Sequence, residues 1–280
     1  RSDGHDGTKK VYINNRSGWP DKTSEWTVPE YFTGENGADL GGRLVDINGD
    51  GMADVIKGWT TSQPPERSVS IITGTQWIKK TERWSPPVDF RIASGDGGVR
   101  LYDANGDGLV DIIHHSGTNN SAWLNNGTGW LRNDSWGSPL AFTDSGLNIG
   151  VRIADVNGDG FADIVSARES AGEKYAYRKA NHSLPVLLRS ITHEFGGVTN
   201  ITYVSSVTFN NSEYGNSTLG FNLYVVSNVT TNNSVAQGFD VVGSVSYNYS
   251  FGVFDNERRE FRGFSRVEER TSDSVVRHYF

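Results

Sequence analysis

A nine-residue pattern of carboxylates and glycines occurs three times in this chain of 280 residues. The copies span residues 46–54, 103–111 and 155–163, and each has the form Asp-x-Asn-Gly-Asp-Gly-x-x-Asp. The pattern constrains the fold in two ways. Its glycines allow the chain to turn sharply at each copy, and its period sets the size of the repeated structural unit.

The chemistry of the pattern predicts a calcium-binding loop. Calcium takes about six to eight oxygen ligands, and a tight loop supplies them from alternate positions, including the backbone carbonyl of the seventh residue. This all-oxygen donor set favours calcium over magnesium, whose octahedral geometry is stricter. We therefore expect three Ca²⁺ sites, whose candidate ligands are Asp46, Asn48, Asp50, Met52 (carbonyl) and Asp54; Asp103, Asn105, Asp107, Leu109 (carbonyl) and Asp111; and Asp155, Asn157, Asp159, Phe161 (carbonyl) and Asp163.

The alternative is a set of Asn-Gly and Asp-Gly hairpin turns without metal. A single copy fits that interpretation. Three copies, each with an aspartate at the ninth position, are harder to explain without an ion. Carboxylates brought close together repel one another, and one of them is pushed towards protonation unless a cation neutralises the group.

The residues after each loop predict strands. They are the β-branched pairs 55–56, 112–113 and 164–165, of types enriched in β-sheets. An EF-hand would instead need a glutamate at position 12 and flanking helices. We therefore expect each metal loop to connect two strands.

The spacing of the loops predicts propeller blades. They begin at Asp46, Asp103 and Asp155, so the period is 57 and then 52 residues, which suits a four-stranded blade. We interpret the recurring tryptophans as core residues between blades, in preference to sugar-binding residues. The residues that recur in the same order are Trp19, Trp77 and Trp130; Trp26, Trp84 and Trp136; Pro29, Pro87 and Pro139; Phe32, Phe90 and Phe142; and Arg43, Arg100 and Arg152.

The character of the sequence changes near residues 180–186. Beyond this point, segments such as 200–204, 223–227 and 241–249 alternate apolar and polar residues, which is typical of strands with one polar face. The predicted fold is all-β: a partial β-propeller of three calcium-loop blades over residues 1–180, then an antiparallel β-sheet domain over residues 185–280. Three blades are too few to close a ring, so we expect either that further blades precede Arg1 or that the three blades form an open stack.

Composition excludes several classes of function. The net charge is −7 and there are no cysteines, so disulfides and zinc–thiolate sites are absent. The nine loop aspartates carry more negative charge than the net −7 of the chain, so the acidity belongs to the predicted metal sites. No basic run long enough to indicate nucleic-acid binding occurs. No apolar stretch is long enough for a membrane span. No nucleophile elbow, phosphate loop or metalloprotease motif occurs, so we expect a protein that is not an enzyme.

Glycosylation sequons are more frequent than composition explains. The chain has eleven Asn-x-Ser/Thr sequons, against roughly four expected by chance. A polar, Asn- and Ser-rich surface is the alternative explanation. The excess favours a secreted, extracellular glycoprotein, and extracellular calcium is concentrated enough to fill even weak sites. The sequon asparagines are Asn15, Asn119, Asn126, Asn133, Asn181, Asn200, Asn210, Asn216, Asn228, Asn232 and Asn248.

Residues 11–177 resemble the FG-GAP/VCBS repeat family, in which calcium loops sit in propellers of the integrin-α type. Loop, tryptophans and arginine recur here in that order. The second half resembles the start of an RHS-repeat shell, as in the B component of insecticidal toxin complexes. The matching runs are residues 187–203, 223–230 and 254–264. In that family the region begins a β-strand shell around a cargo, so the resemblance implies a structural and binding role.

Three functional hypotheses follow. The first is a non-enzymatic, calcium-stabilised scaffold of a toxin-complex-like protein, which needs further blades and RHS repeats of the same protein as partners. The second is an extracellular adhesion or structural glycoprotein that assembles with other proteins or copies of itself through these β modules. The third, which we favour least, is a carbohydrate-degrading enzyme with propeller appendages.

Overall fold

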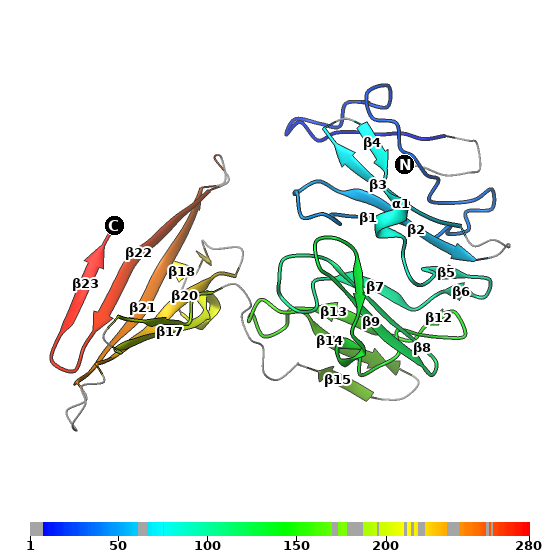
Figure 1. Ribbon diagram of the computed structural model, residues 1–280. Helices are drawn as coiled ribbons and strands as arrows, with labels where there is room; N and C mark the ends of the chain where they lie inside the picture. Colours follow the sequence, from blue (N-terminus) through cyan, green and yellow to red (C-terminus); the bar gives the residue numbers. More distant parts are fainter. Residues whose placement is uncertain are drawn as a thin grey trace. The chain divides into compact units, whose positions relative to one another are not determined.

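In the computed structural model, the regular secondary structure is almost entirely β-strand (Figure 1). It divides into two compact units: Arg1–Ala154 with Ala162–Ser183, and Asp155–Phe161 with Leu184–Phe280. No helix within the described part is long and apolar enough to cross a membrane. The structure describes residues 8–60, 66–74, 76–169, 173–177, 187–194, 196–209, 212–213, 216–217, 222–233, 241–255, 258 and 260–280.

The first sheet of the first unit is an antiparallel four-stranded meander, followed by a short antiparallel pair of strands. Its meander strands are β1 (Gly42–Val45), β2 (Asp54–Thr60), β3 (Glu66–Thr73) and β4 (Gln76–Lys79). The short helix α1 (Thr81–Trp84) follows, and then β5 (Arg91–Ile92) and β6 (Gly95–Asp96). Strand β5 pairs in parallel with the end of β2, while the other pairings are antiparallel.

The second sheet repeats this plan, and the third repeats its beginning. The second contains β7 (Val99–Tyr102), β8 (Asp111–Ser116), β9 (Asn119–Asn125), β10 (Trp130–Arg132), the 3₁₀ turn η1 (Asp134–Trp136), β11 (Thr143–Asp144) and β12 (Leu147–Asn148). The third contains β13 (Val151–Ala154), β14 (Asp163–Arg168) and β15 (Glu173–Tyr177). The prediction of an all-β chain with repeated propeller-type sheets is confirmed.

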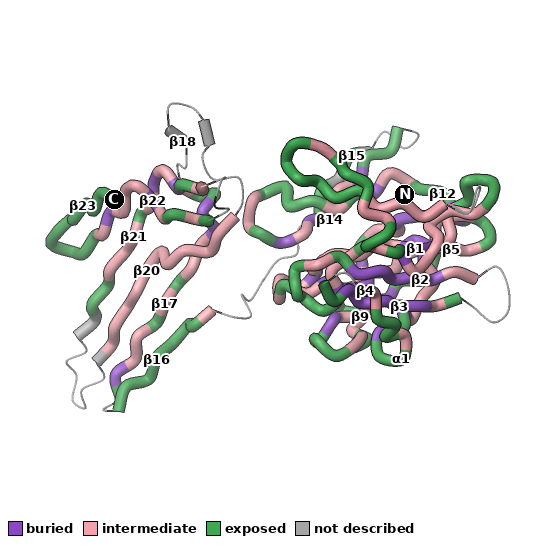
Figure 2. The backbone as a smooth tube through the Cα atoms, turned by 90° about the horizontal axis from the view of Figure 1, so that it is seen from above, coloured by how far each residue is buried: buried purple, intermediate pink, exposed green. Residues whose placement is uncertain are grey.

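Two apolar cores lie between these sheets. The first joins sheets one and two, and includes Ile56, Phe90 and Ile112. The second joins sheets two and three, and includes Ile113 and Phe142. Neighbouring residues of a strand point to opposite faces, so Ile112 and Ile113 on β8 serve the two cores separately. Strands β2 and β3 show the deepest burial (Figure 2).

The prediction that the recurring tryptophans are core residues holds for some of them and not for others. Trp84 is buried and meets Trp130 edge to face at 5.6 Å between ring centroids. The indole N–H of Trp130 also donates to the Trp84 carbonyl at 2.9 Å. Trp19, however, is 67 % exposed. It belongs to the segment before β1, and none of the described residues there contributes to either core cluster.

The second unit is built on one six-stranded antiparallel sheet. Its spatial order is β16 (Ser190–Thr192), β17 (Val198–Ser205), β20 (Tyr224–Asn233), β21 (Val241–Asp255), β22 (Glu260–Arg270) and β23 (Val275–Tyr279). The 3₁₀ turn η3 (Ser206–Thr208) and a small hairpin, β18 (Ser212–Glu213) with β19 (Asn216–Ser217), separate β17 from β20. The predicted strands at 200–204 and 241–249 fall within β17 and β21, and the one at 223–227 falls in β20 except for its first residue, Leu223.

Replacing Phe142 with alanine should destabilise the first unit by about 3–5 kcal/mol, because the ring is fully buried between sheets two and three and its removal leaves a cavity. Urea unfolding followed by tryptophan fluorescence measures this change. Leu147, 70 % exposed, is the matched control, and its alanine variant should stay within about 0.5 kcal/mol of the parent. Equal losses for both variants would contradict the core assignment.

Candidate metal loops

Each Asp-x-Asn-Gly-Asp-Gly segment connects the first and second strands of its sheet. The loops lie between β1 and β2, between β7 and β8, and between β13 and β14. In all three sheets the second strand begins at the ninth residue of the pattern, and that residue is paired in the ladder with the last residue of the first strand. The predicted arrangement of a loop between two strands is confirmed.

The first aspartate of each loop organises the turn. In the first loop, Asp46 Oδ1 accepts the N–H groups of Gly49 at 2.7 Å and Asp50 at 3.2 Å, while Oδ2 accepts that of Gly51 at 2.7 Å. Gly49 and Gly51 have φ of 77° and 84°, which glycine adopts without the strain of a side chain. Asp103 and Asp155 make the same three bonds in their loops.

The third and fifth positions form a second small network. Asn48 Nδ2 donates to Asp50 Oδ2 at 2.9 Å, and Asp50 Oδ1 accepts the N–H of Met52 at 2.9 Å. The corresponding residues of the second and third loops are bonded in the same way. The side chains at positions 1, 3 and 5 are therefore all directed at the turn itself.

The ninth aspartate ties the loop to the sheet. Asp54 is completely buried. Its Oδ2 accepts the N–H of Ile47, inside the loop, and its Oδ1 accepts the N–H of Ile72 on β3, both at 2.9 Å. In the second loop the buried Asp111 accepts from Ala104 at 2.9 Å and from Asn125 on β9 at 2.8 Å. Asp163, at the same position of the third loop, is also buried.

Burial is the main influence on the pKa of the ninth carboxyl in the first two loops. It raises the pKa of Asp111 to about 7, opposed by the N–H groups of Asn125 and Ala104 and reinforced by the carboxylates of Asp107 and Asp103. Burial likewise raises the pKa of Asp54. The shift towards protonation has the direction expected from the sequence, but loss of water contributes more than repulsion between the carboxylates.

The chemistry of the donor set fits calcium. Each loop offers three carboxylates, one amide oxygen and one backbone carbonyl. These groups supply up to about eight hard oxygen atoms when the carboxylates bind through both oxygens, which covers the six to eight that calcium takes. Within the described residues no group of three or more His, Cys, Asp or Glu side chains is placed to hold a metal ion. In the first two loops the ninth aspartate turns both oxygens towards backbone N–H groups. These oxygens keep further lone pairs with which to coordinate an ion. The fifteen proposed ligands and the three Ca²⁺ ions remain predictions.

A buried asparagine links the first two loops, and the sequence pattern did not reveal it. Asn125 is 1 % exposed, and its Nδ2 donates to the carbonyl of Ile47 at 2.8 Å. Its own N–H donates to Asp111. A continuous line of hydrogen bonds therefore runs from Asp54 through Ile47 and Asn125 to Asp111. The available signal was the polar Asn125 directly after the apolar run 122–124 of β9.

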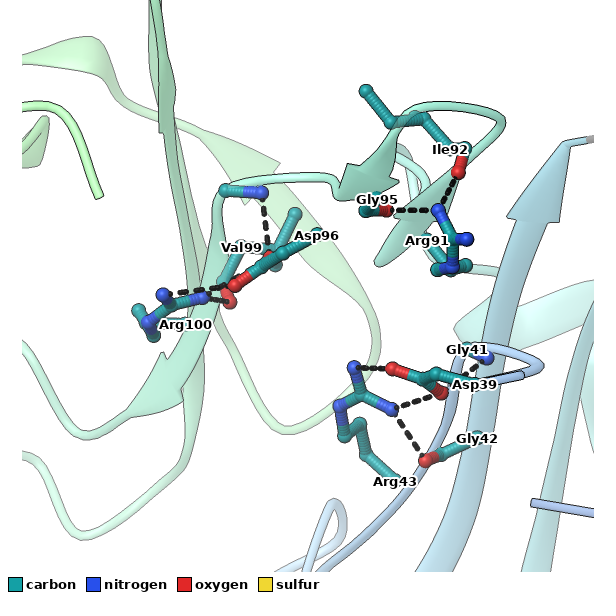
Figure 3. Close-up of polar contacts among 11 residues, drawn as sticks. Asp39, Gly41, Gly42, Arg43, Arg91, Ile92, Gly95, Asp96, Val99 and Arg100 are labelled. Carbon is teal, nitrogen blue, oxygen red and sulfur yellow. Dashed lines mark hydrogen bonds and ion pairs between the residues drawn. The ribbon is translucent and has the colours of Figure 1, made fainter. Parts of the chain in front are cut away.

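The recurring arginines also have partners that the sequence analysis missed. Arg43 forms a two-pronged ion pair with Asp39, and Arg100 pairs with Asp96 (Figure 3). In the third sheet, Arg152 donates to the amide oxygen of Asn148 at 3.0 Å. Each partner lies four residues before its arginine and also accepts the N–H of a glycine two residues after itself. A periodic Asp/Asn-x-Gly-x-Arg pattern was the missed signal.

Most of the predicted glycosylation asparagines that the structure describes are exposed. The exposed ones are Asn15, Asn119, Asn126, Asn200 and Asn248, and the half-buried ones are Asn133, Asn228 and Asn232. Asn181 and Asn210 lie outside the described residues, and of Asn216 only the backbone is described. Exposure makes modification sterically feasible, while occupancy remains a prediction.

Two family profiles match the chain. One, described as the insecticide toxin TcdB middle/N-terminal region, matches residues 139–278. The other, described as an FG-GAP-like repeat, matches residues 103–166, which include the second and third loops. No curated protein gives a significant match.

Solved structures share the fold. A Photorhabdus luminescens Tc holotoxin pore with a TccC3 mutation superposes with a TM-score of 0.62 at 20 % identity, over 96 % of this chain and 12 % of that one. A TcdB2–TccC3 structure without its hypervariable C-terminal region superposes with a TM-score of 0.60 at 20 % identity, over 87 % of this chain and 11 % of that one. The chain thus spans about an eighth of the length of these structures.

Asn125→Ala should destabilise the first unit by about 1–3 kcal/mol, because it leaves the buried carbonyl of Ile47 without its donor. Chemical unfolding in the presence of a chelator isolates this loss from metal binding. Asn119→Ala, an exposed change on the same strand, is the control and should have an effect below about 0.5 kcal/mol. A neutral Asn125 variant would show that the line of hydrogen bonds carries no stability.

Proposed function

Because this chain belongs to the insecticide toxin TcdB middle/N-terminal region family, we propose that it is a non-enzymatic, calcium-stabilised scaffold segment of a secreted toxin-complex-like protein. The observation that carries the proposal is the family match over residues 139–278. That match runs from the second sheet through most of the second unit. The shared fold with Tc toxin structures supports it over nearly the whole chain.

The proposed partners are protein surfaces. One of the similar solved structures combines TcdB2 with TccC3, so a TccC3-like subunit is the partner class we propose for the whole protein. We also propose further propeller blades and RHS repeats from the same protein. Leu44 on β1 supports the further blade: it is 57 % exposed, whereas its equivalents Leu101 and Ile153 pack against the two cores.

The scaffold proposal is tested with the full-length protein. When it is mixed with a TccC3-like subunit, we expect one stable complex by size-exclusion chromatography with light scattering. We expect no hydrolysis of glycan or peptide substrates by either partner-free preparation. Failure to form any complex, or turnover that survives purification to homogeneity, would count against a scaffold.

A second candidate is an extracellular adhesion or structural glycoprotein that assembles through its β modules. The observation in its favour is the exposure of five sequon asparagines in the described part of the chain. Intact mass of the native protein, with and without enzymatic deglycosylation, separates the two. A large mass decrease together with concentration-dependent self-association would favour the adhesion protein. An unchanged mass would remove its main support.

Calcium is proposed to hold each loop and its sheet together. The ion would neutralise three carboxylates that otherwise lie close in sequence and are partly desolvated, and binding to the folded state alone adds to stability. Chelation should lower the melting temperature by roughly 5–10 °C per filled site, given about 2.7 kcal/mol per site at a hundredfold excess over Kd. A melting curve that does not move in excess chelator would contradict the calcium proposal.

Asp50→Ala should remove one of three calcium equivalents in a calorimetric titration and leave the other two nearly intact, because each loop carries its own ligands. Asp144→Ala removes an exposed carboxylate outside the loops and is the control. Its titration should still show three equivalents. Loss of all binding in the Asp50 variant would mean that the loops do not act as separate sites.

The stabilisation by calcium should grow with pH between about 5 and 8. Without metal, the folded carboxyl of Asp111 keeps its proton up to a pKa of about 7, whereas the ordinary value is 3.8. Its contribution to folding is therefore largest below pH 3.8 and is lost as pH rises to 7. Calcium replaces this proton, so the calcium-induced rise in melting temperature should be larger at pH 7.5 than at pH 5. An equal rise at both values would contradict this linkage.

A further inference from the structure

The third loop differs from the first two in what surrounds it. Residues Asp155–Phe161 group with Leu184–Phe280 in the second compact unit, whereas the first and second loops lie wholly within the first unit. The neighbours of the third loop are η3 and the residues that lead into β20. All of the contacts below are therefore internal to the second unit.

Two backbone carbonyls of the third loop accept hydrogen bonds from side chains of this unit. The hydroxyl of Ser205 lies within bonding distance of the Gly158 carbonyl and, at 2.6 Å, of Asn222 Oδ1. It has one proton and can donate to one of these at a time. The hydroxyl of Tyr224 donates to the carbonyl of Asp159. The two carbonyls lie between the proposed ligands Asn157 and Phe161.

The loop is also packed closely against the same residues. A side chain at Gly158 would meet Val207 at 2.6 Å, and one at Gly160 would meet Asn222 Nδ2 at 2.5 Å. The ring of Phe161 lies 6.1 Å from that of Tyr224, centroid to centroid. By contrast, a Cβ built on Gly51 or Gly108, which correspond to Gly160, meets nothing within 4 Å.

We propose that the third metal loop is the point at which calcium orders the second unit, through the contacts of Ser205 and Tyr224 with the loop backbone. This inference rests on the proposed calcium sites. An ion held by Asp155, Asn157 and Asp159 fixes the intervening backbone and so fixes the carbonyls that Ser205 and Tyr224 bind. The first two loops belong to the first unit, so their ions should not have this effect.

The coupling is reciprocal. If calcium in the third loop stabilises the contacts of Ser205 and Tyr224, these contacts must raise the affinity of the third loop for calcium by the same factor. Tyr224→Phe removes one hydrogen bond and keeps the ring next to Phe161. At about 1 kcal/mol per bond, it should weaken calcium binding at the third loop by up to roughly fivefold, the value reached when the whole bond depends on bound calcium. The other two equivalents should be unchanged.

Hydrogen exchange on the full-length protein, with calcium or with chelator, tests the proposal. The segments to follow are 205–208 and 222–226, together with the three loops. The variants are Asp159→Ala in the third loop and, as the matched control, Asp50→Ala at the same position of the first. We expect calcium to slow exchange in both segments of the parent and of the Asp50 variant, but not in the Asp159 variant.

The outcomes distinguish failure of the calcium sites from failure of the coupling between the third loop and the second unit. No protection of any loop by calcium in the parent would overturn the calcium sites themselves. Protection of all three loops without any change at 205–208 and 222–226, or the same change in both variants, would overturn the coupling alone. If Asp159→Ala does not fold, the calcium titration of Tyr224→Phe decides: a third-site affinity equal to that of the parent overturns the coupling.

Discussion

A buried carboxylate at the ninth position of each loop is the constraint on which the repeated sheets depend. Asp54 and Asp111 each accept one N–H from within their loop and one from the third strand of their sheet. One side chain thereby fixes the turn, the first strand pair and the second strand pair. Removing such a carboxylate would leave two buried N–H groups without acceptors, each at a cost of about 1–3 kcal/mol.

Contacts between repeats build on this arrangement. The β8 strand sends Ile112 into the first core and Ile113 into the second, so one strand holds two neighbouring sheets. Asn125 adds a polar link between the first and second loops. A solenoid or propeller gains stability from such nearest-neighbour contacts.

Features that recur periodically in the sequence could be predicted from it, and features that depend on distant contacts could not. The repeated Asp-Gly pattern and the β-branched pairs after it were enough to place three loops between strands, and alternation was enough to find the strands of the second unit. Residues whose role depends on distant neighbours could not be read in this way. Asn125 reaches a carbonyl 78 positions away in the chain, and the contact between Tyr224 and the Asp159 carbonyl spans 65 positions. Trp19 has the periodic position of a core residue but lies outside both core clusters.

The most direct test of the account is a count of bound calcium. Native mass spectrometry of the protein, purified in calcium and then exchanged into volatile buffer, reports the number of ions that remain on each chain. The account predicts three ions that a chelator removes, and none in a variant with Asp50, Asp107 and Asp159 all replaced by alanine. A parent protein that carries no calcium under these conditions would contradict it.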